Sequence, residues 1–153
     1  MNIVLVEPEI PQNTGNIVRT CALTNTTLHL VKPLGFSVED KYLKRAGLDY
    51  WHLVKIIYYE NFNELIAKYP DKSFYYATTK GKNFYTDINY MEDSFIVFGK
   101  ETKGLPESIL NNNLEKTIKI PMKKDIKRSL NLANSVNIIL FEALRQLNFP
   151  YLE

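Results

Sequence analysis

Hydrophobic positions along the chain form short runs that are separated by stretches with helical spacing. The apolar runs are rich in β-forming residues and cover residues 3–6, 28–31, 53–58, 74–77, 95–98 and 117–120. A helix is predicted where apolar residues recur at i, i+3, i+4 and i+7, namely at Phe62, Leu65, Ile66 and Tyr69. Asn61 is a candidate cap for this helix, and Pro70 follows its end. This alternation predicts an α/β fold with a mostly parallel sheet that helices flank on both faces.

A long apolar helix is predicted from about residue 130 to residue 147. One stripe along it consists of Leu132, Val136, Ile139, Ala143 and Leu147, and the stripe is widened by Ala133, Leu140, Phe141 and Leu144. A helix that is apolar over so much of its circumference requires burial on more than one side. It is therefore either central to the fold or also forms a subunit contact.

Length and composition favour one soluble domain over residues 1–153. The 153 residues are 45% hydrophobic, which suits a single packed core, and no repeat or linker interrupts them. No signal peptide precedes the first apolar run, and no run reaches the roughly 18 apolar residues of a membrane span. Cys21 is the only cysteine, which excludes an internal disulfide and a thiolate metal cluster. A reducing cytoplasm is the expected location.

The net charge of +2 is too small to indicate a partner, but the basic residues are clustered. The clusters consist of Lys41, Lys44 and Arg45, then Lys80 and Lys82, then Lys123, Lys124, Lys127 and Arg128. Each cluster alone is as consistent with a solvated surface as with a nucleic-acid contact. A binding surface requires that they converge on one side of the molecule.

Three loops follow predicted strands and are candidates for a site, because ligands of open α/β sheets collect outside the carboxyl ends of the strands. They cover residues 11–15, 99–106 and 121–128. Gly99 and Gly104 permit positive backbone angles or a close approach, and Pro106 suits the first turn of a helix. Ordinary turns are the alternative interpretation of each loop.

These loops lack the motifs of the common nucleotide sites. None has the GxGxxG or GxxxxGK[ST] pattern, and ligands at usable metal spacing are absent. His29 lies within an apolar strand pattern and His52 beside Trp51, so both are predicted to be structural. What remains is a site of backbone amides, asparagine amides, a serine and an arginine, which suits binding and orientation.

The order of these motifs resembles the SPOUT superfamily of methyltransferases. The sequences NTGNIVRT, FGKETKGLP and IPM followed by RSLNLANSVNIILFEALRQ resemble its three motifs. EPEIPQNTGNI and RAGLDYW are similar to the small tRNA 2'-O-methyltransferases that act on the wobble position. The likeness runs nearly end to end, with Leu130 in place of a methionine and Ala133 in place of a serine as mild departures.

The resemblance implies S-adenosylmethionine as donor, S-adenosylhomocysteine as product, no metal, a homodimer and a trefoil knot in the C-terminal third. The implied cofactor contacts are Ala77, Gly99, Glu101, Gly104, Ile120, Met122, Ser129 and Leu130. Without the motifs, Ala77 and Ile120 would be interpreted as plain strand-end packing. Glu101 has two open roles, fixing a loop through backbone amides or simple exposure to solvent.

The implied catalytic residues are Arg19, Asn13, Ser129 and Asn131. Arg19 is held to be catalytic in the family, with Asn13 in support, whereas its alternative is a surface arginine beside a capping loop. We favour a clamp for phosphate and for developing negative charge over a base, because a guanidinium stays protonated. For Ser129, helix capping is the alternative to a contact with cofactor or ribose.

The expected partners are the anticodon loop of tRNA and a second copy of the chain. RNA phosphates are expected at Lys44, Arg45, Lys123, Lys124 and Arg128. Tyr50 and Trp51 are candidates for stacking on bases, although Trp51 is more typical of a core. Phe141 and Leu144 are the expected dimer contacts.

The sequence therefore predicts methylation of the wobble ribose, at position 34 with cytidine or a modified uridine, in leucine tRNAs. One alternative is another tRNA position or ribosomal RNA. Another is a non-catalytic RNA- or nucleotide-binding α/β module, against which the retained Arg19, Ser129 and Asn131 argue.

Overall fold

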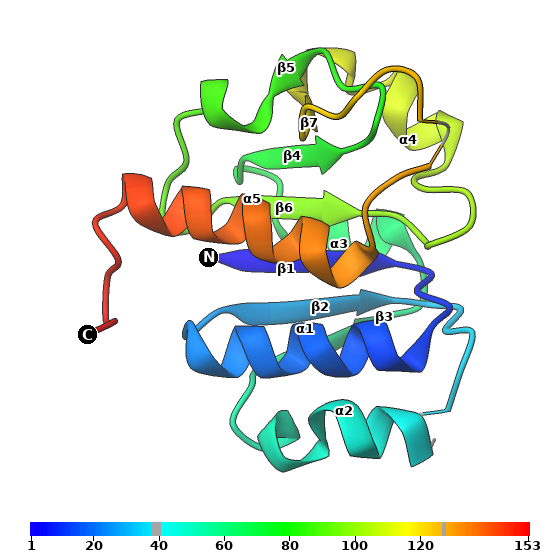
Figure 1. Ribbon diagram of the computed structural model, residues 1–153, viewed down its shortest axis with the longest axis vertical. Helices are drawn as coiled ribbons and strands as arrows, with labels where there is room; N and C mark the ends of the chain where they lie inside the picture. The colour runs from blue at the N-terminus through cyan, green and yellow to red at the C-terminus, as the bar shows by residue number, and fades with distance from the viewer. Residues whose placement is uncertain (38–40, 127) are drawn as a thin grey trace.

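The protein is built on a seven-stranded sheet with the order β3-β2-β1-β6-β4-β7-β5 (Figure 1). The computed structural model describes residues 1–37, 41–126 and 128–153, and the side chains of residues 42, 44 and 46–48 also lie outside the description. The strands are β1 Asn2–Val6, β2 Thr27–Val31, β3 Ile56–Tyr59, β4 Phe74–Ala77, β5 Asn83–Phe84, β6 Phe95–Phe98 and β7 Thr117–Lys119. Neighbouring strands are parallel throughout, so the α/β prediction is confirmed.

Apolar runs locate most of these strands because a parallel sheet is buried on both faces. The prediction for residues 53–58 is wrong at its start, since Leu53 N–H donates to Tyr50 O and Val54 N–H to Trp51 O in a turn that ends the preceding helix. Leu53 is accordingly 62% exposed. Strand β5 was missed, because two residues carry no periodicity.

The helices are α1 Pro11–Leu23, α2 Lys41–Trp51, α3 Phe62–Lys68, α4 Glu107–Asn111 and α5 Leu132–Gln146, with 3-10 turns at Tyr85–Asp87 and Leu114–Lys116. The predicted cap of α3 is confirmed, since Asn61 Oδ1 accepts from the Glu64 N–H. Helix α5 begins at Leu132, two residues later than predicted.

Two cores lie on opposite faces of the sheet. On one face, Ile3 and Leu5 of β1 belong to the core that includes α1 and α5 residues, with Tyr50 and Trp51 of α2 packed against it. On the other face, Val4 of β1 belongs to the core that includes Leu65 of α3, with Ile109 and Leu110 of α4 packed against it. Figure 1 shows α1 and α5 together in front of the sheet, with α2 below α1.

Helix α5 is central to the first core, which corrects one prediction about the dimer. Leu144 is only 2% exposed and packs inside the protomer, so it cannot be a surface contact. Phe141, on the same helix, is 47% exposed.

Strand β7 is inserted between β4 and β5, which are consecutive in the chain. The segment joining those strands closes against β7, since Thr78 N–H donates to Ile118 O at 2.9 Å and Lys82 N–H to Thr117 Oγ1 at 3.0 Å. Gly81 is required there, because a Cβ would lie 2.4 Å from the carbonyl carbon of Ile118. The knot implied by the resemblance stays a prediction.

Within the described ranges, no helix has the length and apolarity to cross a membrane.

All strands end at the same edge of the sheet, on the right of Figure 1. After β1 the chain enters α1 on one face, whereas after the neighbouring β6 it enters α4 on the other face. Such a switch point opens a crevice where α/β proteins bind ligands.

Candidate functional site

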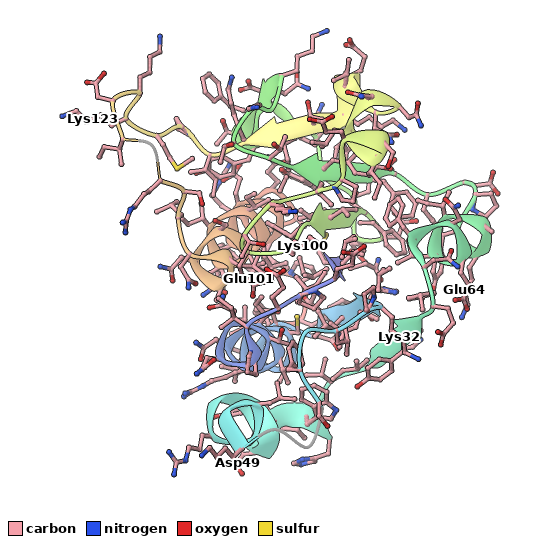
Figure 2. The ribbon with its side chains drawn as sticks, turned by 90° about the vertical axis from the view of Figure 1, so that its right-hand side faces the viewer. Lys32, Asp49, Glu64, Lys100, Glu101 and Lys123 are labelled. Atoms are coloured by element: carbon pink, nitrogen blue, oxygen red, sulfur yellow. The ribbon has the colours of Figure 1, made fainter. Side chains whose placement is uncertain are left out.

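The Glu101 carboxylate joins the loop after β6 to the loop after β1. It accepts hydrogen bonds from the backbone N–H of Glu9 at 2.8 Å, the N–H of Ile10 at 3.1 Å and the Asn13 side-chain amide at 3.1 Å. In Figure 2, Glu101 lies at the middle of the carboxyl edge, between α1 and the loop that contains Lys100. Of its two predicted roles, Glu101 therefore takes the one that fixes a loop through backbone amides.

Asn131 extends this connection to the start of α5. Its amide nitrogen Nδ2 donates to Asn13 Oδ1 at 2.8 Å, while its Oδ1 accepts from the N–H groups of Ala133 and Asn134 and so caps α5. Residues 118 positions apart are thus in direct contact. The Glu101–Asn13–Asn131 chain thus joins the loop at residues 99–106 to the starts of α1 and α5. The prediction of a loop at residues 11–15 is wrong, because α1 already begins at Pro11. Asn131, not Ser129, is the cap of α5.

Four further residues strengthen the junction and were missed from the sequence. Lys100 Nζ lies 2.6 Å from Glu7 Oε2, and this hydrogen bond raises the pKa of Lys100 above its ordinary value. Glu9 Oε2 accepts from the hydroxyl of Thr102 at 2.8 Å and from its N–H at 3.3 Å. Glu7 also has a positive φ of 52°, a conformation that a non-glycine residue adopts at a cost of about 1–3 kcal/mol. The only signal for these pairs was the acidic residues of EPE and the polar residues of GKET.

The two glycines of the second loop have different roles. A Cβ on Gly99 would lie 2.0 Å from the carbonyl carbon of Gly104, so the loop folds tightly back on Gly99. Gly104 has a φ of 69° with open space around it, and its N–H donates to Lys100 O at 2.8 Å. The predicted close approach is thus at Gly99 and the predicted positive angle at Gly104.

The residues predicted to contact a cofactor begin at three adjacent strand ends. Ala77 ends β4, Gly99 follows β6 and Ile120 follows β7, and these strands are neighbours in the order β6-β4-β7. Met122 and Leu130 lie in the segment between β7 and α5, and their side chains are 38% and 40% exposed. Ser129, in the same segment, is also exposed. Small or apolar residues thus lie at three adjacent strand ends, and Met122 and Leu130 add exposed apolar side chains in the segment after β7.

Arg19 lies on the side of α1 that faces α2. Its guanidinium carbon is 5.1 Å from the centre of the Tyr50 ring, within the range of a cation–π contact. The next residue, Thr20, faces α5, where its hydroxyl donates to Asn137 Oδ1 at 2.8 Å. Helix α1 therefore contacts α2 through Arg19 and α5 through Thr20, and the Arg19 side chain is exposed.

The predicted RNA-binding residues that the structure describes are exposed. These are Arg45, Lys123, Lys124 and Arg128, whereas the Lys44 side chain and Lys127 lie outside the described part of the chain. Figure 2 places Lys123 above the junction and α2, marked by Asp49, below it. Two of the basic clusters thus flank the edge at which Glu101 lies.

The buried titratable groups near the sheet are structural. His29 bonds Tyr59 OH at 2.9 Å through Nδ1 and Asn2 Oδ1 at 3.1 Å through Nε2. Burial, with smaller contributions from Lys55 and Lys68, lowers the pKa of His29 to about 4. Burial also raises the pKa of the Cys21 thiol to about 12. The residues that the structure describes contain no group of three or more His, Cys, Asp or Glu side chains placed to hold a metal.

The family model of the SpoU rRNA methylases matches residues 1–141, which includes all three loops and most of α5. The chain belongs to the SpoU methylase family. Its members are RNA methyltransferases, and the predicted SPOUT likeness is confirmed. A similar protein from Bacillus subtilis, named as a putative tRNA (cytidine(34)-2'-O)-methyltransferase, is 50% identical over 97% of this chain and 94% of its own length.

Solved structures of similar proteins share the fold. A putative RNA methyltransferase from Bacillus anthracis is 49% identical with a TM-score of 0.92, over 99% of this chain and 97% of its own. A second structure, described as giving structural insights into the 2-OH methylation of C/U34 on tRNA, is 39% identical with a TM-score of 0.91. The match covers 96% of this chain and 95% of that chain. The SpoU methyltransferase AviRb from Streptomyces viridochromogenes, solved with AdoMet, is 22% identical with a TM-score of 0.84 over 97% of this chain and 60% of its own, and shows the fold alone.

Proposed function

We propose that this SpoU family member transfers a methyl group from S-adenosylmethionine to the ribose 2'-hydroxyl of the wobble nucleotide of tRNA. S-adenosylhomocysteine is the leaving group, and the hydroxyl proton is released to water. The observation that carries the proposal is the Glu101–Asn13–Asn131 chain, which joins the loop after β6 to the starts of α1 and α5 at the switch point of the sheet. The B. subtilis relative is named for cytidine 34 of tRNA, which supports the nucleotide. We extend the proposal to leucine tRNAs, with cytidine or a modified uridine at position 34.

The residues at the strand ends fit the proposed cofactor. An adenine requires a flat apolar slot with a few backbone polar groups, and Ala77, Gly99 and Ile120 offer small or apolar side chains at three adjacent strand ends. Met122 and Leu130 add exposed apolar surface from the following loop. When bound there, S-adenosylmethionine supplies an electrophilic methyl group on a sulfonium. Glu101 and Gly104 shape the loop that borders this slot, since the Glu101 carboxylate is occupied by protein donors.

Arg19 is proposed to bind a phosphate of the target nucleotide and to stabilise negative charge on its 2'-oxygen. A guanidinium offers five N–H donors in a planar fork and remains protonated, so it serves better as a clamp than as a base. Positioning then supplies most of the acceleration, because well-oriented reactants gain roughly 7–11 kcal/mol over a bimolecular encounter.

The asparagines position α1 and α5 for this step. Asn131 Oδ1 is occupied by two backbone N–H groups, and one Nδ2 hydrogen is occupied by Asn13. The second Nδ2 hydrogen is proposed to donate to the ribose, and the exposed Ser129 hydroxyl to the cofactor or ribose.

The exposed basic residues Arg45, Lys123, Lys124 and Arg128, with Lys44, are proposed to bind phosphates of the anticodon loop. We also propose a cytoplasmic, single-domain protein that acts as a homodimer through α5. Ile138 and Phe141 are exposed on that helix at 36% and 47%, which supports an apolar contact.

Two measurements test the proposal. Calorimetric titration with S-adenosylmethionine is expected to show one site per chain, and absence of binding would remove the methyltransferase proposal. Transfer of labelled methyl to purified tRNA and, separately, to ribosomal RNA is expected to label tRNA and to be lost in Arg19→Ala. The matching family model is named for rRNA methylases, so ribosomal RNA is the alternative substrate. Labelling of ribosomal RNA alone would replace tRNA with ribosomal RNA as the proposed substrate.

A further inference from the structure

The contact between Arg19 and Tyr50 crosses from one helix to another and lies outside the three loops of the site. Arg19 belongs to α1, and Tyr50 lies near the end of α2, which packs on α1 away from the sheet. Tyr50 is half-buried because it packs against the core that includes α1. Its ring is therefore held in place, whereas Arg19 is an exposed side chain with several rotatable bonds.

An arginine that clamps RNA requires orientation without the loss of its donors. Ion pairs and hydrogen bonds to protein would occupy N–H groups that the RNA needs. None of the side chains that the structure describes makes such a bond to the Arg19 guanidinium. An aromatic face at 5.1 Å orients the guanidinium through its π-electrons and leaves the N–H groups in its plane available.

We propose that Tyr50 is a positioning residue for Arg19, which holds the guanidinium toward the RNA phosphate, and that it is not a platform for an RNA base. The inference rests on the role of Arg19 in the proposed function. The aromatic face carries the effect, and the hydroxyl is dispensable.

A double-mutant cycle on tRNA binding tests the inference, because it requires no turnover. Dissociation constants are measured at one fixed salt concentration for the wild type, Tyr50→Leu, Tyr50→Phe, Arg19→Ala and the double variant Tyr50→Leu/Arg19→Ala. Tyr50→Leu is expected to weaken binding by about two- to fivefold, the range of an exposed cation–π contact. Tyr50→Phe is expected to match the wild type, and Tyr50→Leu is expected to have no further effect once Arg19 is removed. Tyr151→Leu, which removes an exposed ring near the C-terminus, is the matched control and is expected to leave binding unchanged.

Three outcomes would overturn the inference. An equal loss from Tyr50→Leu with and without Arg19 would mean that the ring contacts RNA directly. An equal loss in Tyr50→Phe would assign the effect to the hydroxyl, and no loss in Tyr50→Leu would leave the ring without a role.

A separate measurement distinguishes this inference from the proposed function. Nuclear Overhauser contacts between the Arg19 side chain and the Tyr50 ring are expected in the free wild-type protein, which needs neither RNA nor cofactor. Their absence would overturn the inference. Their presence in a protein that neither binds nor methylates tRNA would instead overturn the proposed function.

Discussion

Replacement of Glu101 by glutamine tests the junction between the loops, because the two side chains have the same shape but different hydrogen-bonding capacity. The carboxylate accepts three bonds, from Glu9 N–H on one oxygen and from Ile10 N–H and Asn13 Nδ2 on the other. An amide has one acceptor oxygen and a donating NH2 group. In either orientation, Glu101→Gln directs a donor at a backbone N–H and loses at least one bond to a charged acceptor.

The structure sets the expected size of the effect. A hydrogen bond to a charged group contributes about 1.5–3 kcal/mol. Glu101 is half-buried, so water compensates in part, and we expect a loss of about 1.5–2 kcal/mol in the free energy of unfolding. At a slope of about 2 kcal/mol per molar urea, the midpoint of unfolding falls by about 1 M.

Urea unfolding followed by far-UV circular dichroism measures the loss, and hydrogen exchange localises it to the Glu9 and Ile10 amides. The matched control is Glu115→Gln, which removes a carboxylate that pairs with Lys82 at an exposed position and is expected to have little effect. If Glu101→Gln leaves both the midpoint and the protection of these amides unchanged, the reasoning about the junction is refuted.

The remaining predictions concern the glycines, a buried histidine and the cap of α5. Gly99→Ala is expected to lower the free energy of unfolding by about 3 kcal/mol or more, because its Cβ would overlap backbone atoms. Gly104→Ala is expected to lower it by about 1–2 kcal/mol, because only the backbone angle φ is strained. Equal melting temperatures of the two variants would contradict this. The pKa of His29 is lowered to about 4 in the fold, so its neutral form stabilises the fold above an unfolded pKa of about 6.5, and about 3 kcal/mol is lost as the pH falls from 6.5 to 4. Unfolding measured over this range should have a flatter pH dependence in His29→Gln than in the exposed control His52→Gln, and equal slopes would contradict the assignment. Asn131→Ala is expected to lower the free energy of unfolding by about 1–2 kcal/mol through loss of the helix cap. It is also expected to lower the rate of methyl transfer through loss of the contact with Asn13. A full rate in a destabilised protein would show that Asn131 acts only as a cap.

The strands were predictable because burial on both faces makes each a short apolar run. The runs at residues 3–6, 28–31, 74–77 and 95–98 match strands almost residue for residue. Strand β3 was placed too early because Leu53 extends the apolar run, although its backbone belongs to the turn after α2. Hydrophobicity does not distinguish an exposed leucine in a turn from a buried one in a strand.

The location of the site was predictable from the strand ends, but its contacts were not. The loop at residues 99–106 follows β6 as predicted, whereas the loop predicted at residues 11–15 is wrong because α1 begins at Pro11. The bond between Asn13 and Asn131 depends on how α1 and α5 pack together. Side-chain pairing across 118 positions leaves no periodic signal in one sequence. The same reason explains why Leu144 was assigned to a dimer surface, since an apolar stripe does not show which of its members the sheet covers.

The most direct measurement is the position of the methyl group on tRNA. Leucine tRNA from cells that lack this protein is incubated with the enzyme and S-adenosylmethionine, and is then digested for mass-spectrometric mapping of nucleosides. A 2'-O-methyl group at position 34, absent from a reaction with Arg19→Ala, is the result that the account predicts. A methyl group at another position, or on a base in place of the ribose, would contradict it.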